Sequence, residues 1–231
     1  MPPFNLKDRL VYGVRIWSSA IHQSLAHSNE FSLSTGTIVE LACGSGPLRK
    51  YVSVEWFYVG LDIEQTYLDR SAPTNLIGDV HRMPFKSDSV DVLVTVSSVQ
   101  YFNHNVFFEE CHRVLRAGGV VLLHENGPAN PFIMLSRLIQ RIMGLFFHDQ
   151  WRYRNTIRRY YRPKEIPEGF SVEYKRAVGV ISPLCFMADK IGIRTPDRII
   201  NRLEEIDRML VGKFPLLERF VFLNIAHLRR R

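Results

Sequence analysis

Residues 39–48, VELACGSGPL, restrict the possible folds of this chain more than any other stretch. The apolar residues up to Leu41 suit a buried parallel strand, and Gly44 and Gly46 suit a tight turn that a ligand approaches closely. Glu40 breaks the apolar pattern, because a carboxylate near the end of a buried strand is costly unless another group pairs with it. The stretch therefore predicts a strand that leads into a ligand-binding turn, with an acid at the junction.

Further apolar runs extend this pattern along the first half of the chain. Together with the first run they predict strands at 37–41, 57–62, 75–77, 90–96 and 120–124. Residues 107–119, FFEECHRVLRAGG, predict a helix closed by glycines at its C-terminal end. Strands that alternate with helices or turns indicate an α/β fold whose sheet is mainly parallel, with helices on both faces.

The remainder of the chain predicts more helices and two late strands. An amphipathic helix is expected over 5–27, and further helices over 131–147 and 196–211. Strand-like runs follow at 171–181 and 220–228. These two late strands predict an antiparallel hairpin at the edge of the sheet.

Length and charge indicate one domain with a distinct C-terminal part. A chain of 231 residues suits a single α/β domain over 1–231, in which 1–130 form the core and 131–231 an elaboration. Residues 1–150 carry 12 Lys/Arg against 14 Asp/Glu, a net charge of −2, whereas residues 151–231 carry 18 against 9, a net charge of +9. The basic excess in the last third suggests a separate role for that part.

Cysteine usage and the first residues indicate the compartment. Cys43, Cys111 and Cys185 are far apart and form no CxxC pair, which argues against a zinc site or a disulfide framework and favours a reducing compartment. The start, MPPFNLKDRL, has no apolar region typical of a signal peptide. We therefore expect a cytoplasmic protein.

The apolar segment 131–147 is the strongest candidate for membrane contact. Arg137 and Arg141 interrupt it, so it does not suit a spanning helix. We expect a helix that covers the sheet or forms a lid over the pocket. A helix lying on a membrane surface, which would make the protein membrane-peripheral, is the alternative.

Each of the first three predicted strand ends carries an acid: Glu40, Asp62 and Asp79. Ligands of open α/β sheets lie beyond the carboxyl ends of the parallel strands, where such acids can accept hydrogen bonds from ribose hydroxyls. Asp62 lies 22 residues after Glu40, close to the spacing seen in nucleotide-binding folds. A dinucleotide-dependent oxidoreductase is disfavoured, because the third glycine of its G-x-G-x-x-G pattern would fall on Arg49.

Four stretches together resemble the class I S-adenosylmethionine-dependent methyltransferases of the type 11 group. They are VELACGSG, VGLDI, GDVHRMPFKSDSVDVLVTVSSVQYF and ECHRVLRAGGVVLLHENGPANP, and they cover roughly residues 37–131. The resemblance implies a Rossmann-like α/β fold, S-adenosylmethionine as cofactor and methyl transfer as the activity.

The resemblance also implies which residues contact the cofactor. The turn at 42–46 would wrap the methionine part, Asp62 would hold the ribose, and Asp79 with Val80 would flank the adenine. Ser97, after the fourth strand, would line the methionyl and sulfonium end. The full expected set is Glu40, Ala42, Gly44, Ser45, Gly46, Asp62, Ile63, Asp79, Val80 and Ser97.

The chain departs from the family pattern in two places. Ala42 replaces the first glycine of the turn, a change that is tolerated if its backbone φ is below zero. Ala117 replaces the proline that usually precedes the two glycines before the fifth strand. In addition, VSSVQYF lacks the [DNS]-P-P-[YFW] motif of enzymes that methylate exocyclic amines of DNA bases or glutamine amides, which disfavours that class.

Candidates for acceptor chemistry lie at or just after the fourth and fifth strands. Methyl transfer depends chiefly on alignment, and a general base is needed only when the acceptor carries a proton that must be removed. Tyr101, His104, His124 and Glu125 are the candidate bases or acceptor contacts. The other histidines show no ligand spacing, so we expect no metal.

Residues 151–164, WRYRNTIRRYYRPK, combine six cations with aromatic residues. Arg158 and Arg159 suit a phosphate or carboxylate, and Trp151 and Tyr160 suit a sugar, a base or a prenyl chain. Alternatively, the segment is a solvated helix and loop. The first interpretation predicts an acceptor with an anionic group.

Several functions remain open at this point. Methyl transfer to a small-molecule or lipid/glycan-linked acceptor is the favoured hypothesis. An RNA methyltransferase that uses the basic last third is one alternative, and a non-catalytic cofactor-binding module is another. The sequence does not identify the acceptor or the atom that is methylated.

Overall fold

The computed structural model describes residues 35–44, 46, 48–49, 52–66, 68, 74–127, 129–131, 134–135, 138, 166–185, 188, 193 and 195–231. The predicted helix over 5–27, most of the predicted helix over 131–147 and the basic segment 151–164 lie outside these residues.

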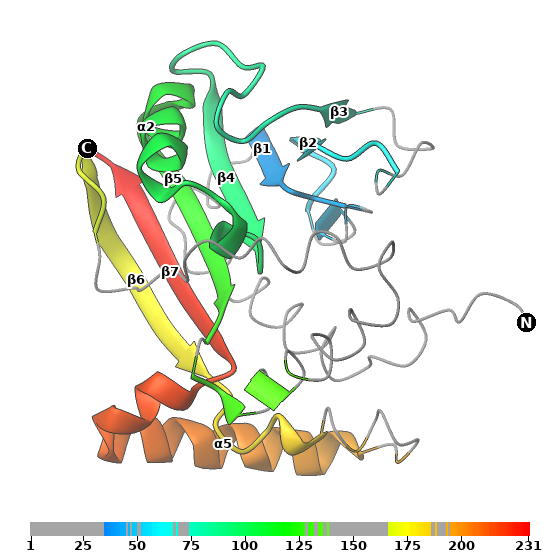
Figure 1. Ribbon diagram of the computed structural model, residues 1–231, viewed down its shortest axis with the longest axis vertical. Helices are drawn as coiled ribbons and strands as arrows, with labels where there is room; N and C mark the ends of the chain where they lie inside the picture. The colour runs from blue at the N-terminus through cyan, green and yellow to red at the C-terminus, as the bar shows by residue number, and fades with distance from the viewer. Residues whose placement is uncertain are drawn as a thin grey trace, which may run out of the picture.

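A seven-stranded sheet forms the centre of the molecule, in the order β3-β2-β1-β4-β5-β7-β6 (Figure 1). Neighbours among β1 to β5 pair in parallel, whereas β7 is antiparallel to both β5 and β6. The strands are β1 (Gly36–Leu41), β2 (Trp56–Asp62), β3 (Asn75–Ile77), β4 (Val90–Val96), β5 (Leu115–Asn126), β6 (Phe170–Val178) and β7 (Leu223–Arg230). The predicted mainly parallel α/β fold with a late antiparallel pair at one edge is confirmed.

The central strands are apolar because both faces of the sheet are buried. All residues of β4 before Val96 are buried, as are the last four residues of β1. β1 lies between β2 and β4, so the chain runs first toward one edge of the sheet and then toward the other. Such a reversal point is where α/β sheets bind their ligands, beyond the carboxyl ends of the strands.

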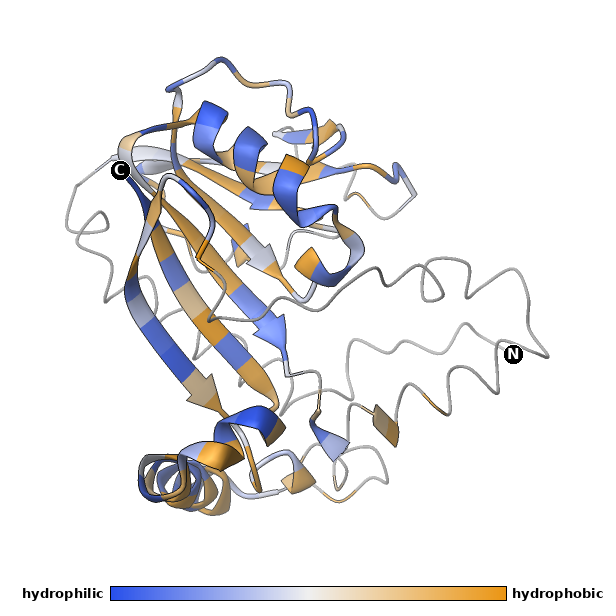
Figure 2. Cartoon of the chain, turned by 60° about the vertical axis from the view of Figure 1, so that its left-hand side comes forward, coloured by the Kyte–Doolittle hydropathy of each residue, from blue (hydrophilic) through white to orange (hydrophobic). Residues whose placement is uncertain are grey.

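Helix α2 (His104–Val114) packs on one face of the sheet, and α5 (Asp197–Lys213) crosses the end of β6 and β7 and contacts the other face there (Figure 1). Alternate residues of a strand point to opposite faces. In β7, Ala226 and Leu228 belong to the apolar cluster that includes Phe107 of α2. Ile225, between them in sequence, belongs to a second cluster with Ile200 of α5. Figure 2 shows the corresponding apolar residues along the central strands.

The helix predicted over 107–119 is shorter than expected. α2 ends at Val114, and Leu115 already has an extended backbone as the first residue of β5. Gly118 and Gly119 therefore belong to the strand and do not cap the helix. The pairing of β4 with β5 shifts register nearby, and a Cβ at Gly119 would lie 3.0 Å from the Asp91 carbonyl oxygen. The glycines allow this close backbone approach at an irregular strand start.

The other boundaries lie close to the predictions. β3 and β4 have the predicted bounds, and β1 and β2 begin one residue earlier than predicted. Two 3-10 helices, η4 (Val99–Tyr101) and η6 (Pro215–Phe220), complete the described elements. None of the described helices is long and apolar enough to cross a bilayer.

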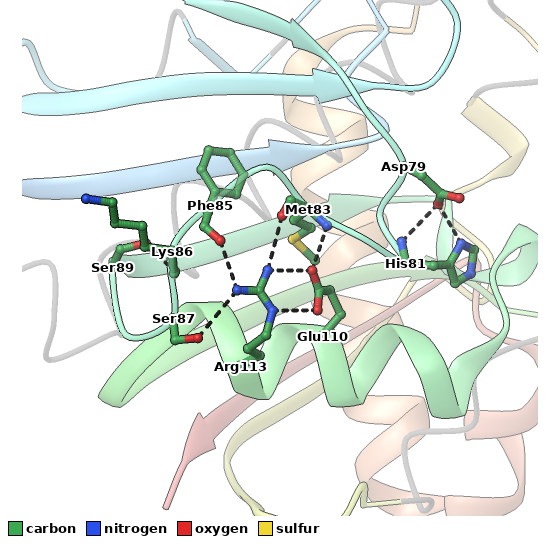
Figure 3. Close-up of polar contacts among 9 residues, drawn as sticks. All are labelled: Asp79, His81, Met83, Phe85, Lys86, Ser87, Ser89, Glu110 and Arg113. Carbon is green, nitrogen blue, oxygen red and sulfur yellow. Dashed lines mark hydrogen bonds and ion pairs between the residues drawn. The ribbon is translucent and has the colours of Figure 1, made fainter.

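An ion pair on α2 fixes the loop between β3 and β4 (Figure 3). Arg113 donates to both carboxylate oxygens of Glu110, with Nε···Oε2 at 2.8 Å and Nη2···Oε1 at 2.6 Å. Its guanidinium also donates to the carbonyl oxygens of Met83 and Phe85, and the Met83 N–H donates to Glu110. Arginine suits this position because its planar fork serves several acceptors at once.

We expect Arg113→Met to lower the free energy of unfolding by about 2–3 kcal/mol, because it removes the charge partner of Glu110 and leaves two carbonyl groups without their donor. Chemical denaturation monitored by circular dichroism measures the loss. Arg202→Ala is the matched control: its pair with Glu205 lies on the exposed side of α5, and such pairs contribute less than about 0.5 kcal/mol. Equal losses in the two variants would contradict the special role of Arg113.

Candidate functional site

The turn after β1 is connected to the end of β2 through Asp62. The Gly44 N–H donates to Asp62 Oδ2 (N···O 2.8 Å), and the Glu64 N–H donates to Oδ1 (2.9 Å). A backbone hydrogen bond from the Cys43 N–H to the Leu61 carbonyl oxygen (3.1 Å) lies beside them. The carboxylate of Asp62 is buried and held in one orientation at the carboxyl edge of the sheet.

Left-handed backbone conformations recur through this turn. Gly44 and Gly46 have φ values of +51° and +67°. Ala42 has φ of +50°, so the condition of a negative φ, under which this replacement of glycine would be tolerated without strain, is not met. A non-glycine residue in this region costs roughly 1–2 kcal/mol. Two flanking contacts hold the strained turn: the Gly44–Asp62 bond on one side and the buried Glu40 on the other.

The described residues leave open the place where Gly44 would carry a Cβ. A Cβ built there would have none of their atoms within 4 Å, apart from its own chain neighbours, whereas a Cβ on Gly46 would lie 3.1 Å from the Tyr58 hydroxyl oxygen. Gly46 therefore packs on the protein, and Gly44 faces room that a ligand could fill. Ser45, the remaining predicted residue of this turn, lies outside the described residues.

Glu40 supports the turn from beneath. Its Oε2 accepts hydrogen bonds from the Tyr58 hydroxyl (2.5 Å) and from the Leu48 N–H (3.2 Å). Burial raises the pKa of Glu40 to about 7, although both hydrogen bonds oppose the shift. Sequence reasoning missed Tyr58. The available signal was a hydroxyl-bearing residue on the strand next to a buried acid.

Asp79 and His81 link the loop after β3 to the start of α2, and Figure 3 shows the contacts between these two residues. Asp79 Oδ1 accepts from the His81 N–H (2.9 Å) and contacts the ring Nδ1 (2.6 Å). His81 Nε2 accepts the Asn103 N–H (2.9 Å), so Nδ1 is the nitrogen that carries the proton and donates to Asp79. Asp79 is exposed and Val80 is buried. His81 thus couples the predicted adenine-flanking acid to the residue that precedes α2.

The loop after β4 contains buried polar atoms that lack hydrogen-bond partners. Ser97 has φ of +55°, and its N–H donates to the His124 carbonyl oxygen at 2.8 Å. Within the described part of the chain, Ser97 Oγ, Ser98 Oγ and Gln100 Oε1 are buried and have no partner. Unsatisfied buried polar atoms at the edge of a sheet are consistent with a polar ligand or water at this place.

Glu125, at the end of β5, holds the same loop. Its Oε1 accepts from Thr95 Oγ1 (2.9 Å) and from the Ser98 N–H (3.4 Å). Burial raises the pKa of Glu125 to about 7. Burial, with a smaller effect of nearby His227, lowers the pKa of His124 to about 3, so His124 is neutral. Both residues are fully enclosed by protein.

The other two acceptor candidates lie in η4 and at the start of α2. Tyr101 ends η4 and packs partly buried against the α2 cluster. His104 begins α2, and its Nε2 donates to the Val99 carbonyl oxygen at 3.2 Å. Four predicted acceptor residues lie outside the described residues: Trp151, Arg158, Arg159 and Tyr160. Across the described ranges, no group of three His, Cys, Asp or Glu residues is placed to hold a metal ion.

The residues present fit S-adenosylmethionine. Asp62 presents a fixed carboxylate at the place expected for ribose hydroxyls, and the space at Gly44 can take the methionine chain. Ser97 Oγ, buried and unpartnered among the described residues, suits the polar methionyl end. Ile63 is exposed directly after Asp62 and offers an apolar surface.

Known proteins that resemble this chain are methyltransferases. Residues 39–123 match the family model described as a methyltransferase domain. The chain is 30% identical over 97 residues to a malonyl-[acyl-carrier protein] O-methyltransferase of Dechloromonas aromatica, covering 40% of this chain and 37% of that protein. It is 28% identical over 120 residues to phthiotriol/phenolphthiotriol dimycocerosates methyltransferase 1 of Mycobacterium ulcerans, covering 47% of this chain and 43% of that protein. The chain thus spans less than half the length of these relatives.

A solved structure extends the likeness of the fold to most of the chain. A SAM-dependent methyltransferase from Archaeoglobus fulgidus superposes with a TM-score of 0.54 at 11% identity, covering 94% of both chains. The match of the family model, the order of the strands and the turn fixed by Asp62 agree with one another. Residues 39–123 thus match a methyltransferase domain, and the chain is similar there to the class I S-adenosylmethionine-dependent methyltransferases of the type 11 group.

Proposed function

We propose that this chain transfers a methyl group from S-adenosylmethionine to a small-molecule or lipid/glycan-linked acceptor. The observation that carries the proposal is the turn at Gly44, which is open toward a ligand and hydrogen-bonded to Asp62 of the neighbouring strand. When bound, the cofactor supplies a methyl group activated on a sulfonium cation. The protein has to bind, align and shield the reacting groups.

Each described cofactor residue has a proposed task. Asp62 accepts hydrogen bonds from the ribose hydroxyls, with its orientation fixed by two backbone N–H groups. Asp79 and Val80 flank the adenine, and Ser97 contacts the methionyl end. Glu40 also acts through the turn: its Oε2 accepts from Tyr58 and from the Leu48 N–H, and these bonds position the turn.

Among the base candidates, the enclosed pair is best explained by structural roles. Glu125 binds Thr95 and Ser98 and holds the loop that carries Ser97. A neutral imidazole whose pKa is about 3, as at His124, is a weak base. We therefore favour Tyr101 and His104, which are only partly buried, as the candidates that contact the acceptor.

A lipid-linked or carrier-linked acceptor is supported by the relatives. Their names give malonyl-[acyl-carrier protein] and the phthiotriol dimycocerosates as the molecules that those two proteins methylate. We propose that residues 131–231 shape the acceptor pocket and that the arginines at 151–164 recognise an anionic group on the acceptor.

The alternative of an RNA acceptor loses part of its support in the structure. It depended on the basic last third of the chain, including the final arginines. Arg229 pairs with Glu173 and donates to the Gly118 carbonyl oxygen, and Arg230 pairs with Asp88. These two cations hold the sheet together and are not available as a phosphate-binding tail.

Asp62→Ala should weaken binding of S-adenosylmethionine by about 1.5–3 kcal/mol, because it removes charge-assisted hydrogen bonds to the ribose. Isothermal calorimetry with S-adenosylhomocysteine measures the change. The wild-type protein should gain melting temperature with either compound and none with NAD. If Asp62→Ala bound with wild-type affinity, the ribose assignment would be wrong.

Gly44→Val should abolish cofactor binding while the sheet still folds, because the branched side chain enters space that the described residues leave open and also strains a turn residue whose φ is +51°. Circular dichroism checks folding, and calorimetry checks binding. Gly212→Val is the control for added volume, because a Cβ at Gly212 also has no atom within 4 Å but lies on α5. Normal binding by Gly44→Val would make this turn purely structural.

Glu40→Gln should change how stability depends on pH. The pKa of Glu40 is raised to about 7 in the folded protein, from 4.5. The neutral form therefore stabilises the fold fully below pH 4.5, and this contribution is lost as pH rises toward 7. Relative to Glu40→Gln, the wild type should lose about 3 kcal/mol across this interval.

Denaturation of both proteins at several pH values gives the difference curve. Glu125, whose pKa is raised to a similar value, is present in both proteins and cancels. A difference in stability that stays constant with pH would show that Glu40 is not buried as described.

A further inference from the structure

Large apolar side chains gather unburied at the end of α5 and along η6. Met209 is 64% exposed, Phe214 50%, Leu216 75% and Phe220 44%. We call these four residues the α5–η6 tip. Single exposed apolar side chains are ordinary, but several of them on one short segment mark an interaction surface.

The opposite side of α5 already has its packing partners. Ile200 is buried in the cluster with Leu223 and Ile225. Asp207 is also buried, and its carboxylate accepts the N–H groups of Ile181 (2.6 Å) and Ser182 (3.0 Å). The helix is therefore fixed on the sheet by one side, and Met209 faces outward. Figure 2 shows apolar and hydrophilic residues side by side along this helix.

Cations are the sequence neighbours of three of the tip residues. Lys213 Nζ lies 5.7 Å from the centroid of the Phe214 ring, and Arg208 and Arg219 flank the apolar residues in sequence. Across the described ranges, none of these three cations has an ion-pair partner, whereas the nearby acid Glu218 is paired with Lys175 at 2.9 Å. The surface thus offers apolar groups within a positive rim.

We infer that the α5–η6 tip docks onto a lipid bilayer that contains anionic headgroups. Apolar side chains next to Lys and Arg are the pattern of segments that lie at the interface, where the apolar groups enter the acyl boundary and the cations meet the headgroups. The six residues of η6 extend only about 12 Å, which is small for a stable protein interface of about 800 Å² per partner. A bilayer needs no such area.

A second copy of this chain fits the tip less well. In a twofold dimer the same patch faces itself, so Lys213 and Arg219 would lie opposite equivalent cations. Like charges that face each other across an interface oppose association. Anionic headgroups complement the rim instead.

The tip is connected to the chain that leaves the carboxyl end of β5. Asn130 Nδ2 donates to the Phe220 carbonyl oxygen (2.7 Å), and the Gly127 N–H donates to the Phe222 carbonyl oxygen (2.9 Å). The chain that leaves the carboxyl end of β5 is thus bound to the end of η6, and Figure 1 shows α5 at that end of the sheet. Docking would bring the acceptor side of the sheet to the membrane. This link to a lipid acceptor rests on the proposed function, but the docking itself does not.

Vesicle co-sedimentation of the full chain tests the inference. We expect binding to phosphatidylcholine vesicles that contain about one third phosphatidylserine, and weaker binding to phosphatidylcholine alone. Leu216→Ser combined with Phe214→Ser should lower the binding constant at least about tenfold. Lys213→Ala should lower it about fivefold, and salt of about 0.5 M should weaken it further.

Two matched variants control for nonspecific effects. Val54→Ser removes an apolar side chain that is 95% exposed before β2, and Lys86→Ala removes an exposed cation from the loop before β4. Both should bind vesicles like the wild type. Vesicle binding by the tip variants as strong as that of the wild type would overturn the inference, because any membrane contact would then lie elsewhere. The inference would also be overturned if the wild type formed a dimer that the tip variants abolish and bound no vesicles. The affinity for S-adenosylhomocysteine, measured by calorimetry, should be unchanged in the tip variants. This result would separate docking from cofactor binding.

Discussion

A carboxyl group removed from water holds the strand end on which the candidate site depends. Glu40 lies in β1, accepts from Tyr58 of β2 and from the Leu48 N–H beyond the turn, and so joins three segments. Burial makes the charged form unfavourable, and the pKa of Glu40 rises to about 7. From the other side, Asp62 accepts the Gly44 N–H. A turn with left-handed residues persists only when its surroundings hold it in this way.

The same arrangement recurs at the end of β5. Glu125 is also buried with its pKa raised to about 7, and it also accepts a backbone N–H from the loop of a neighbouring strand, at Ser98. The loop that it holds includes Ser97, another residue with positive φ. Two buried acids thus order two loops at one edge of the sheet. Ordering before binding lowers the entropy that must be lost when cofactor and acceptor are aligned.

Local patterns were enough to predict most of the fold. The parallel strands are buried on both faces, so each appears in the sequence as a short apolar run, and the order of these runs predicts the α/β architecture. The acids at Asp62 and Asp79 were also evident, because each directly follows an apolar run. Contacts between distant segments were not evident. Tyr58 beneath the turn and the Arg113 contacts with Met83 and Phe85 depend on how the segments pack.

Neighbouring strands decide the backbone conformation at two places where residue type alone is misleading. Alanine disfavours positive φ, yet Ala42 has φ of +50°, and the glycines at 118–119, expected to cap a helix, belong to β5. Asp62 fixes the turn beside Ala42, and the carbonyl group of Asp91 lies close to Gly119. A residue's backbone conformation is decided by such tertiary contacts as well as by its own preference.

The net charge of the last third of the chain does not show where its cations lie or what they bind. The last third of the chain is basic, and a count alone suggests a polyanion such as RNA. Arg229 and Arg230 are used inside the protein, on Glu173 and Asp88. In the described part of the chain, Lys213 and Arg219 lie instead beside exposed apolar side chains, which a nucleic acid backbone would leave in water. A partner that is both anionic and apolar matches that combination better, and a bilayer surface has both properties.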